Sequence, residues 1–393
     1  MINIEDQYFS YNKYFLLALG LWPYWQTRLA YIQYIFLLGF LSTAIIFHFT
    51  TFITAKCTVY LVIKVLSSAF LFIDIMVQYF SFHTNNVTVK VLLEELQRIC
   101  DEIKDNNELA IIRRYGNVSR CYAMWFMVSI FCLNLILILV SSWPSILDFV
   151  QPRNESRLRN LLFPMEYFVD QHRYYYLILL YQNTIICIGT VALLSTGSLF
   201  FSFQKYICGM FTIASYRIKQ SIKSDTTQKT KLQCRNPIAE IVSAVEIHRR
   251  AMKFSKHMVN EFEVMLCILV ATGVCSLSLN LFQIFLIISS EYNINELFLP
   301  TGAAMIIAVY MFLANYIGQD LTDHNRQIFI AAYNICWYKT PLNVQRLILF
   351  LLQRGVKDFM VSIGGLINAS LECFAMMANV SVSYFSVLYS TQG

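Results

Sequence analysis

The sequence has few charged residues: Asp, Glu, Lys and Arg make up 14% of its 393 residues, whereas 57% are hydrophobic. A soluble domain carries about 25% charged residues, so this composition excludes a water-soluble protein and predicts several membrane spans. The basic residues of 204–263 are typical of a solvated surface that faces membrane lipid, and nothing else in the sequence points to nucleic acid.

The motifs of common catalytic and cofactor sites are also missing. The chain has no Gly-rich phosphate loop, no His-x-x-x-His pair and no nucleophile elbow, and its six histidines do not cluster. Its eleven cysteines form no Cys-x-x-Cys pair, which excludes the usual zinc and redox motifs. We therefore predict neither an enzyme nor a metal or cofactor site, and receptor, channel and transporter remain.

Seven apolar stretches are long enough to cross a bilayer as helices, which takes about 20 residues each. The seven prolines lie at or outside the ends of these stretches, which argues against a transporter built on broken helices. The predicted fold is therefore an all-α integral membrane protein with seven transmembrane helices. The stretches are approximately 31–49, 59–80, 122–142, 174–203, 264–288, 299–318 and 359–388.

The basic residues are divided unequally between the two sides of these spans. With a cytoplasmic N-terminus, the inner segments hold 24 Lys and Arg residues and the outer segments hold 5, with Lys64 inside the second span. Cytoplasmic loops carry an excess of such residues, so we predict a cytoplasmic N-terminus and an extracellular C-terminus. The sequon at Asn154 then lies outside and is the predicted glycosylation site.

Single polar residues interrupt the first two spans. Asp74 lies deep in the second span and needs a hydrogen-bond donor inside the bundle, whereas Lys64 can reach the outer interface. We interpret His48 as a hydrogen-bonded packing residue. Whether Asp74 has a structural or a functional role stays open.

The last stretch carries its polar residues on one side of a helix. Such a stripe either hydrogen-bonds to neighbouring helices or borders water. Because the stripe continues to the end of the last span, two interpretations remain: a water-lined pathway and hydrogen bonding between helices. The residues of the stripe are Asn368, Glu372, Asn379, Ser383, Ser386 and Ser390.

From residue 314 onward the sequence resembles the insect odorant receptor family. The spacing from Gly318 to Tyr384 matches the family throughout, and elsewhere the resemblance rests on length, seven spans and inverted topology. Asn325 and Val356 depart from the residues common in the family. The matching residues are Gly20–Pro23 near the N-terminus and then Tyr316, Gly318, Asp320, Leu321, Ala331, Tyr333, Trp337, Tyr338, Arg346, 347–352, Gln353, Arg354, Gly364, Gly365, 370–374 and 383–388.

This resemblance implies an odorant-gated, non-selective cation channel in the plasma membrane of sensory-neuron dendrites. An odour-tuned subunit of this kind assembles with a co-receptor subunit into a heterotetramer and binds a small volatile ligand. The chain lacks the enlarged second cytoplasmic loop of the co-receptor. A G-protein-coupled chemoreceptor or a small-solute transporter is the alternative. The predicted orientation and the missing Asp-Arg-Tyr and Asn-Pro-x-x-Tyr motifs stand against the former.

The resemblance also divides the chain into four parts. Residues 1–30 form a cytoplasmic or interfacial segment, 31–318 a six-span bundle with a ligand pocket in its outer half, 319–358 a cytoplasmic anchor, and 359–393 the pore-lining span with a short outer tail. Within the anchor, Thr340 is expected to cap a helix of about 14 residues that Pro341 opens and Gly355 closes.

The stripe and the register of the family together predict the pore. Val387 is expected to form an apolar ring that closes a wettable pore by dewetting. Thr391 stands where the co-receptor type of subunit has Leu, which predicts looser closure at that level. The predicted pore and gate residues are Asn379, Ser383, Val387, Ser390 and Thr391.

The ligand pocket is expected on the spans that surround it in the family, at mid to outer depth. A few polar groups among aromatic and aliphatic side chains are typical of a small-molecule site. The predicted contacts are Phe70, Phe72, Ile73, Asn134, Ile138, Tyr181, Ile307 and Tyr310.

Overall fold

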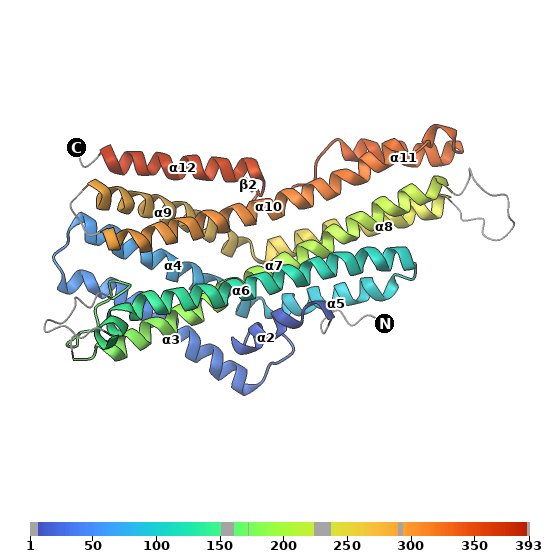
Figure 1. The fold of residues 1–393 in the computed structure, drawn as a ribbon. Helices are drawn as coiled ribbons and strands as arrows, with labels where there is room; N and C mark the ends of the chain where they lie inside the picture. The colour runs from blue at the N-terminus through green and yellow to red at the C-terminus, as the bar shows by residue number, and fades with distance from the viewer. Residues whose placement is uncertain (1–6, 151–160, 172, 224–236, 290–293, 391–393) are drawn as a thin grey trace.

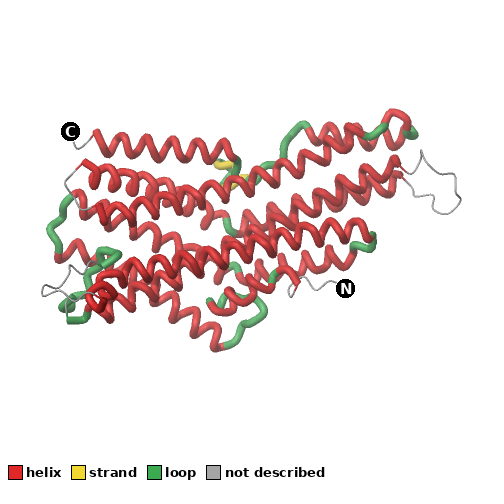
Figure 2. Tube along the Cα trace, in the orientation of Figure 1, coloured by secondary structure: helices red, strands yellow, loops and turns green. Residues whose placement is uncertain are grey.

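The computed structural model describes residues 7–150, 161–171, 173–223, 237–289 and 294–390, and these form a helical bundle with one two-residue hairpin (Figure 1, Figure 2). The helices are α2 (Ser10–Ala18), α3 (Arg28–Thr54), α4 (Val59–Thr84), α5 (Asn86–Glu102), α6 (Asn106–Val150), α7 (Tyr175–Lys223), α8 (Pro237–Glu261), α9 (Glu263–Ser289), α10 (Phe298–Asn334), α11 (Leu342–Gly355) and α12 (Leu371–Ser390). Two short 3-10 helices, Ile294–Leu297 and Trp337–Lys339, precede α10 and α11.

Seven of these helices are long and apolar enough to cross a membrane, which confirms the predicted fold class. They are α3, α4, α6, α7, α9, α10 and α12. Threonine side chains fix where the first two begin: Thr27 accepts the backbone N–H of Ala30 at 3.3 Å, and Thr58 accepts that of Leu61 at 3.2 Å. Such N-caps satisfy backbone donors that have no partner within the helix.

Three of the spanning helices are longer than a bilayer requires. The helices α6, α7 and α10 contain 45, 49 and 37 residues, and at 1.5 Å per residue they reach about 55–75 Å, roughly twice the thickness of the hydrocarbon core. Their far ends pack with α5, α8 and α11, at the end of the molecule opposite the C-terminus (Figure 1). The helices therefore form a membrane bundle that continues into a second helical region.

The predicted start of the last span is wrong. The stretch 359–388 was expected to be one helix, but α12 begins only at Leu371. Before it, strands β1 (Ser362–Ile363) and β2 (Ile367–Asn368) form a hairpin in which Gly364 and Gly365 have φ values of +62° and +65°. Left-handed backbone interrupts a helix whatever its hydropathy, and Asn368 therefore lies in the hairpin and outside the helical stripe.

The predicted anchor helix is confirmed in length but not in its cap. Helix α11 has 14 residues and ends at Gly355, as expected. The hydroxyl of Thr340, however, donates to the carbonyl oxygen of Trp337 at 2.6 Å, and Pro341 takes the N-cap position without a side-chain bond. Thr340 closes the preceding 3-10 turn because its side chain points back along the chain.

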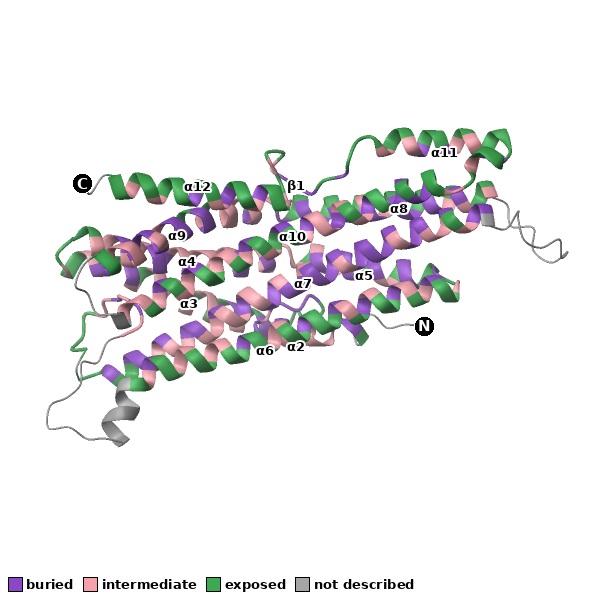
Figure 3. Cartoon of the chain, turned by 45° about the horizontal axis from the view of Figure 1, so that its top comes forward, coloured by how far each residue is buried: buried purple, intermediate pink, exposed green. Residues whose placement is uncertain are grey.

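The N-terminal segment is tied to the bundle by buried polar contacts. Asn12 of α2 donates to Ser202 at 3.1 Å and accepts from Ser198 at 2.6 Å, and both partners lie on α7. After α2, the hydroxyl of Tyr79 on α4 donates to the carbonyl oxygen of Leu19 at 2.8 Å. The buried side chains around these bonds belong to the main core, which runs from α2 to the β-hairpin (Figure 3).

A glycine sets the position of α12. Gly318 on α10 packs against the residue that follows the hairpin, and a Cβ at Gly318 would lie 2.5 Å from the carbonyl oxygen of Ala369. Real Cβ atoms do not approach another atom so closely, so only glycine lets α10 and the start of α12 meet here. The chain has one other glycine on α10, Gly302, where an added Cβ meets nothing within 4 Å.

We expect Gly318→Ala to lower the free energy of unfolding by about 1–3 kcal/mol, because the added methyl group overpacks the contact with Ala369. The matched variant Gly302→Ala should leave stability unchanged or raise it by up to about 1 kcal/mol, since alanine favours helix. Thermal unfolding of the purified protein in detergent measures both. Equal melting temperatures for the two variants would show that the contact at Gly318 tolerates a side chain.

Candidate pore helix and ligand-binding region

Helix α12 is held at its first turn by side-chain hydrogen bonds. Ser370 accepts the backbone N–H of Cys373 at 3.1 Å, and the backbone N–H of Ser370 donates to the Asn315 side chain on α10 at 3.3 Å. Asn315 is buried and also donates to the carbonyl oxygen of Met311 at 2.9 Å. The helix therefore starts from a fixed point on α10.

Only one face of α12 is covered by the rest of the chain. Cys373, Met377 and Ser381 are buried and recur every fourth residue, which places them on the side that packs against α9 and α10. Cys373 and Met377 join Val274 and Met311 in a small apolar cluster that is separate from the main core. Towards the end of the helix, the Tyr389 ring packs edge-on against Phe285 of α9, with ring centroids 4.9 Å apart.

The predicted pore residues lie on the uncovered side of this helix. Asn379, Ser383, Val387 and Ser390 are all exposed in the single chain, and the side chain of Val387 is 58% exposed (Figure 3). Thr391 lies outside the described residues. The structure thus brings four of the five residues to one surface, and their role in a pore stays a prediction.

The stripe hydroxyls bond within their own helix. Ser383 donates to the carbonyl oxygen of Asn379 at 2.9 Å, Ser386 to that of Val382 at 2.9 Å, and Ser390 to that of Val387 at 2.8 Å. Among the described residues, none of these three hydroxyls is bonded to another helix. Hydrogen bonding to neighbouring helices of the same chain therefore does not explain the stripe.

Two predicted pocket residues lie in aromatic clusters near one end of the bundle. Tyr181 hydrogen-bonds with Thr43 at 2.6 Å and packs against the rings of Phe40 and Tyr167, 5.1 and 5.6 Å away between centroids. Phe72 is buried and packs edge-on against Phe163 at 5.3 Å. The segment 161–167 thus supplies rings to both clusters.

His48 belongs to the same region. It is buried, its Nδ1 hydrogen-bonds with the carbonyl oxygen of Ala44 at 2.7 Å, and its ring centroid lies 5.1 Å from that of Phe72. The interpretation of His48 as a hydrogen-bonded packing residue is confirmed.

A buried polar chain crosses the middle of the bundle at Tyr310. Gln78 of α4 donates to the Tyr310 hydroxyl on α10 at 3.0 Å and accepts from Thr196 of α7 at 2.8 Å. One turn away, Asp74 accepts a hydrogen bond from Thr272 of α9, which is the donor that its depth in the bundle requires. Sequence reasoning missed Gln78 and Thr196, although a glutamine within an apolar span signals a polar contact.

The remaining pocket candidates are distributed over other helix contacts. Asn134 of α6 donates to Thr190 of α7 at 2.8 Å and accepts from it at 3.1 Å. Ile307 packs against the cluster that contains Met377 of α12. Phe70, Ile73 and Ile138 are half-buried. The eight predicted residues therefore do not converge on one point, and the pocket stays a prediction.

Two cavities of the structure lie away from the predicted pocket residues. A cavity of about 130 Å³ adjoins α2 and the start of α3, and one of about 410 Å³ lies between the ends of α5, α6, α7 and α8. Neither is lined by any of the eight residues. In the described chain, aromatic and aliphatic side chains fill the region around Tyr181 and Phe72.

A charged cluster joins the helices where the membrane bundle meets the second region. Lys205 of α7 forms an ion pair with Asp320 of α10 at 2.8 Å, and His324 hydrogen-bonds with Tyr115 of α6 at 2.8 Å. Cys208, Asp320 and His324 hold their ligand atoms within 4.8 Å of one another, as a metal site requires. The Lys205 ammonium already neutralises the carboxylate, so we interpret this cluster as an ion pair and not as a metal site.

Further into the second region, a buried histidine links α8 to α10. Nε2 of His248 donates to Oδ1 of Asn325 at 2.7 Å, between the rings of Phe211 and Phe329. Burial in this apolar setting lowers the pKa of His248 below its usual value. The asparagine that departs from the family pattern at position 325 thus has a structural partner.

Comparison with known proteins identifies the family. The model of the 7tm Odorant receptor family matches residues 58–382, which is most of the chain. The chain belongs to the insect odorant receptor family. The receptor is 21% identical to Odorant receptor Or2 of Anopheles gambiae over 150 residues, which are 38% of this chain and 39% of that protein. It is 18% identical to Odorant receptor 10 of Aedes albopictus over 154 residues, 39% and 40% of the two chains.

Solved structures show the same fold at low sequence identity. The insect olfactory receptor OR5 from Machilis hrabei in complex with eugenol matches the receptor with a TM-score of 0.78 at 13% identity, over 98% of this chain and 99% of that one. A second structure of OR5 matches with a TM-score of 0.76, also at 13% identity, over 98% and 97% of the chains. The alignment with the two mosquito receptors spans only about two fifths of their length.

For the pocket, we expect Ile307→Ala to raise the odorant concentration for half-maximal response about tenfold, because burying an Ile side chain contributes about 1.5 kcal/mol or more. The adjacent Ile306→Ala serves as the matched control, since Ile306 is 40% exposed on the surface of the bundle. Dose–response curves at equal surface expression compare the two. If alanine at Ile307 and at the other seven positions leaves the curve unmoved, the pocket lies elsewhere.

Proposed function

We propose that the receptor is the odour-tuned subunit of an odorant-gated, non-selective cation channel. The observation that carries this proposal is the uncovered polar face of α12. A spanning helix with polar groups facing outward is unstable against lipid, so that face needs water or another subunit beside it. A central pore shared by several subunits satisfies both needs at once.

In such a pore, Asn379 and Ser383 provide a lining that water wets, and Val387 provides the narrow apolar ring. Because the valine side chains exclude water when they approach one another, they close the pore without a plug, and a small outward movement of α12 wets it again. Ser390 and Thr391 continue the lining towards the outer end of the helix.

The partner in this proposal is the odorant co-receptor subunit, in a heterotetramer. Support comes from the exposed apolar side chains at the far end of the molecule, including Tyr333 on α10 and Leu349 and Phe350 on α11. These residues are 69%, 50% and 69% exposed in the single chain. Helix α11 lies beyond the membrane bundle, at the end opposite the C-terminus (Figure 1). Subunits that meet along α12 and α11 cover both surfaces.

A physical link connects the proposed pocket to the pore. Ile307 packs into the same apolar cluster as Cys373 and Met377, which lie on the covered face of α12. An odorant that displaces Ile307 therefore changes the packing against α12 directly. Packed clusters change in discrete steps, so a small displacement at the ligand can select a different position of the pore helix.

We place the receptor in the plasma membrane with its N-terminus in the cytoplasm. The excess of basic residues in the segments that contain α5, α8 and α11 supports this orientation, because all three helices lie at the end opposite the C-terminus. Asn154, the proposed glycosylation site, lies outside the described residues.

Whole-cell recording tests the function. We expect odorant-evoked cation current when the chain is expressed with the co-receptor, because the pore needs α12 from every subunit, and we expect the current to persist when G-protein signalling is blocked. The co-receptor alone is the control for odour tuning. Current that disappears with the G-protein block would instead support a metabotropic receptor.

A further inference from the structure

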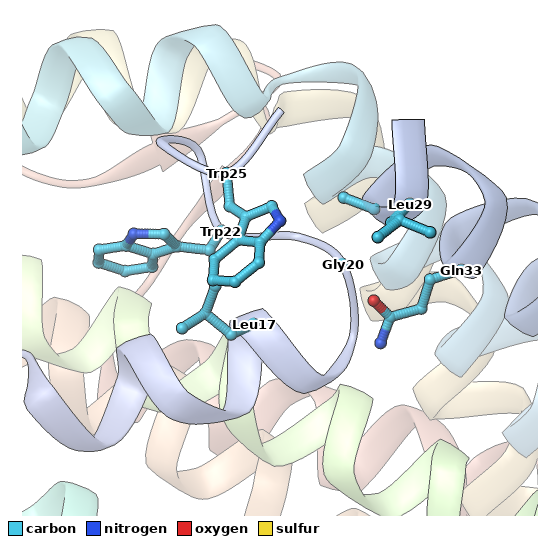
Figure 4. A pocket seen from close by; sticks show the side chains of 7 residues that line it. Leu17, Gly20, Trp22, Trp25, Leu29 and Gln33 are labelled. Atoms are coloured by element: carbon cyan, nitrogen blue, oxygen red, sulfur yellow. The ribbon is translucent and has the colours of Figure 1, made fainter. Parts of the chain in front are cut away.

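The cavity of about 130 Å³ has a defined place in the fold. It lies between the end of α2, the turn that follows and the first two turns of α3, as Figure 4 shows. Its volume is close to that of an engineered cavity of about 150 Å³ that holds benzene, so it admits a ring or a short run of methylene groups. It is lined by Leu17, Gly20, Trp22, Trp25, Leu29, Ala30 and Gln33.

Most of the side chains that line this cavity are apolar, and those of Trp25 and Gln33 are hydrogen-bonded. The indole N–H of Trp25 donates to the Thr27 hydroxyl at 2.8 Å, and the side-chain amide of Gln33 donates to the carbonyl oxygen of Ala18. The cavity is therefore suited to an apolar occupant.

The mouth of the cavity has the character of a membrane interface. Trp25 and Leu29 form its rim and are 53% and 74% exposed, at the first residues of a spanning helix. Arg28 stands between them in the sequence and has no ion-pair partner among the residues that the structure describes. An apolar cavity beside a basic side chain matches an anionic amphiphile.

We propose that this cavity holds part of one acyl chain of an anionic phospholipid whose phosphate lies against Arg28. The assignment rests on the proposed orientation, which puts the cavity in the cytoplasmic leaflet, where anionic lipids are abundant. Binding there fills the space between α2 and α3. Because α2 is hydrogen-bonded to α7 through Asn12, the lipid stabilises the attachment of the N-terminal segment to the bundle.

Tryptophan fluorescence tests this directly, since Trp22 and Trp25 line the cavity. The purified receptor, with its other three tryptophans replaced by Phe, is placed in nanodiscs containing phosphatidylserine or phosphatidylcholine, each brominated midway along one acyl chain. Bromine quenches only on contact. We expect stronger quenching by brominated phosphatidylserine, and we expect Arg28→Gln to reduce that preference about fivefold, as the loss of one basic residue at an anionic surface predicts.

Two further variants keep the test decisive. Ala30→Leu fills the cavity and should reduce quenching by both lipids, whereas Arg249→Gln, which removes an exposed charge on α8, should leave the lipid preference unchanged. If the two lipids quench equally in the parent protein, in Arg28→Gln and in Ala30→Leu, the proposal is overturned. The quenching would then come only from the lipid that surrounds the receptor. In a variant that keeps Trp22 as its only tryptophan, quenching by aqueous acrylamide in place of bromine would overturn the proposal and mean that water fills the cavity, because Trp22 is buried in the chain itself. The nanodiscs carry the lipid in both leaflets, and the experiment records no current. A negative result would therefore contradict the lipid site without contradicting the proposed channel function.

Discussion

The close approach of α10 to the start of α12 is the constraint on which the rest of the arrangement depends. Gly318 has no side chain, so the backbone around Ala369 can lie directly on α10. The adjacent hydrogen bond from Ser370 to Asn315 then fixes the first turn of α12. Everything further along that helix, including which face is covered and which is left open, follows from this starting point.

The difference between the two sides of α12 is the basis for proposing a pore. The covered face consists of Cys373, Met377 and Ser381 and packs against α9 and α10, whereas the uncovered side carries amide and hydroxyl groups among exposed apolar side chains. Elsewhere in the described bundle, Gln78 pairs with Tyr310 and Thr196 on two other helices. The side chains of Asn379 and Ser383 instead face outward from the chain, which is expected of a surface completed by assembly.

Much of the fold could be predicted because hydropathy and length report directly on membrane spans. The polar stripe of α12 was equally visible, since helical spacing places Asn379 and Ser383 on one face. The hairpin before α12 was not predicted. Gly364 and Gly365 interrupt the helix through their left-handed backbone conformation, which hydropathy does not report. The pocket could not be predicted residue by residue, because contacts such as those of Tyr181 with Phe40 and Tyr167 depend on how distant helices cross.

The central claim is that the uncovered face of α12 borders a water-filled pore. Cysteine modification measures this with two matched variants on one helix: Ser383 is exposed and Ser381, two residues earlier, is fully buried against α9. When the receptor is expressed with the co-receptor, a charged thiol reagent added during odorant stimulation should alter the current of Ser383→Cys and leave that of Ser381→Cys and the unsubstituted receptor unchanged. A current that is insensitive to the reagent in Ser383→Cys, while Ser381→Cys responds, would contradict the account.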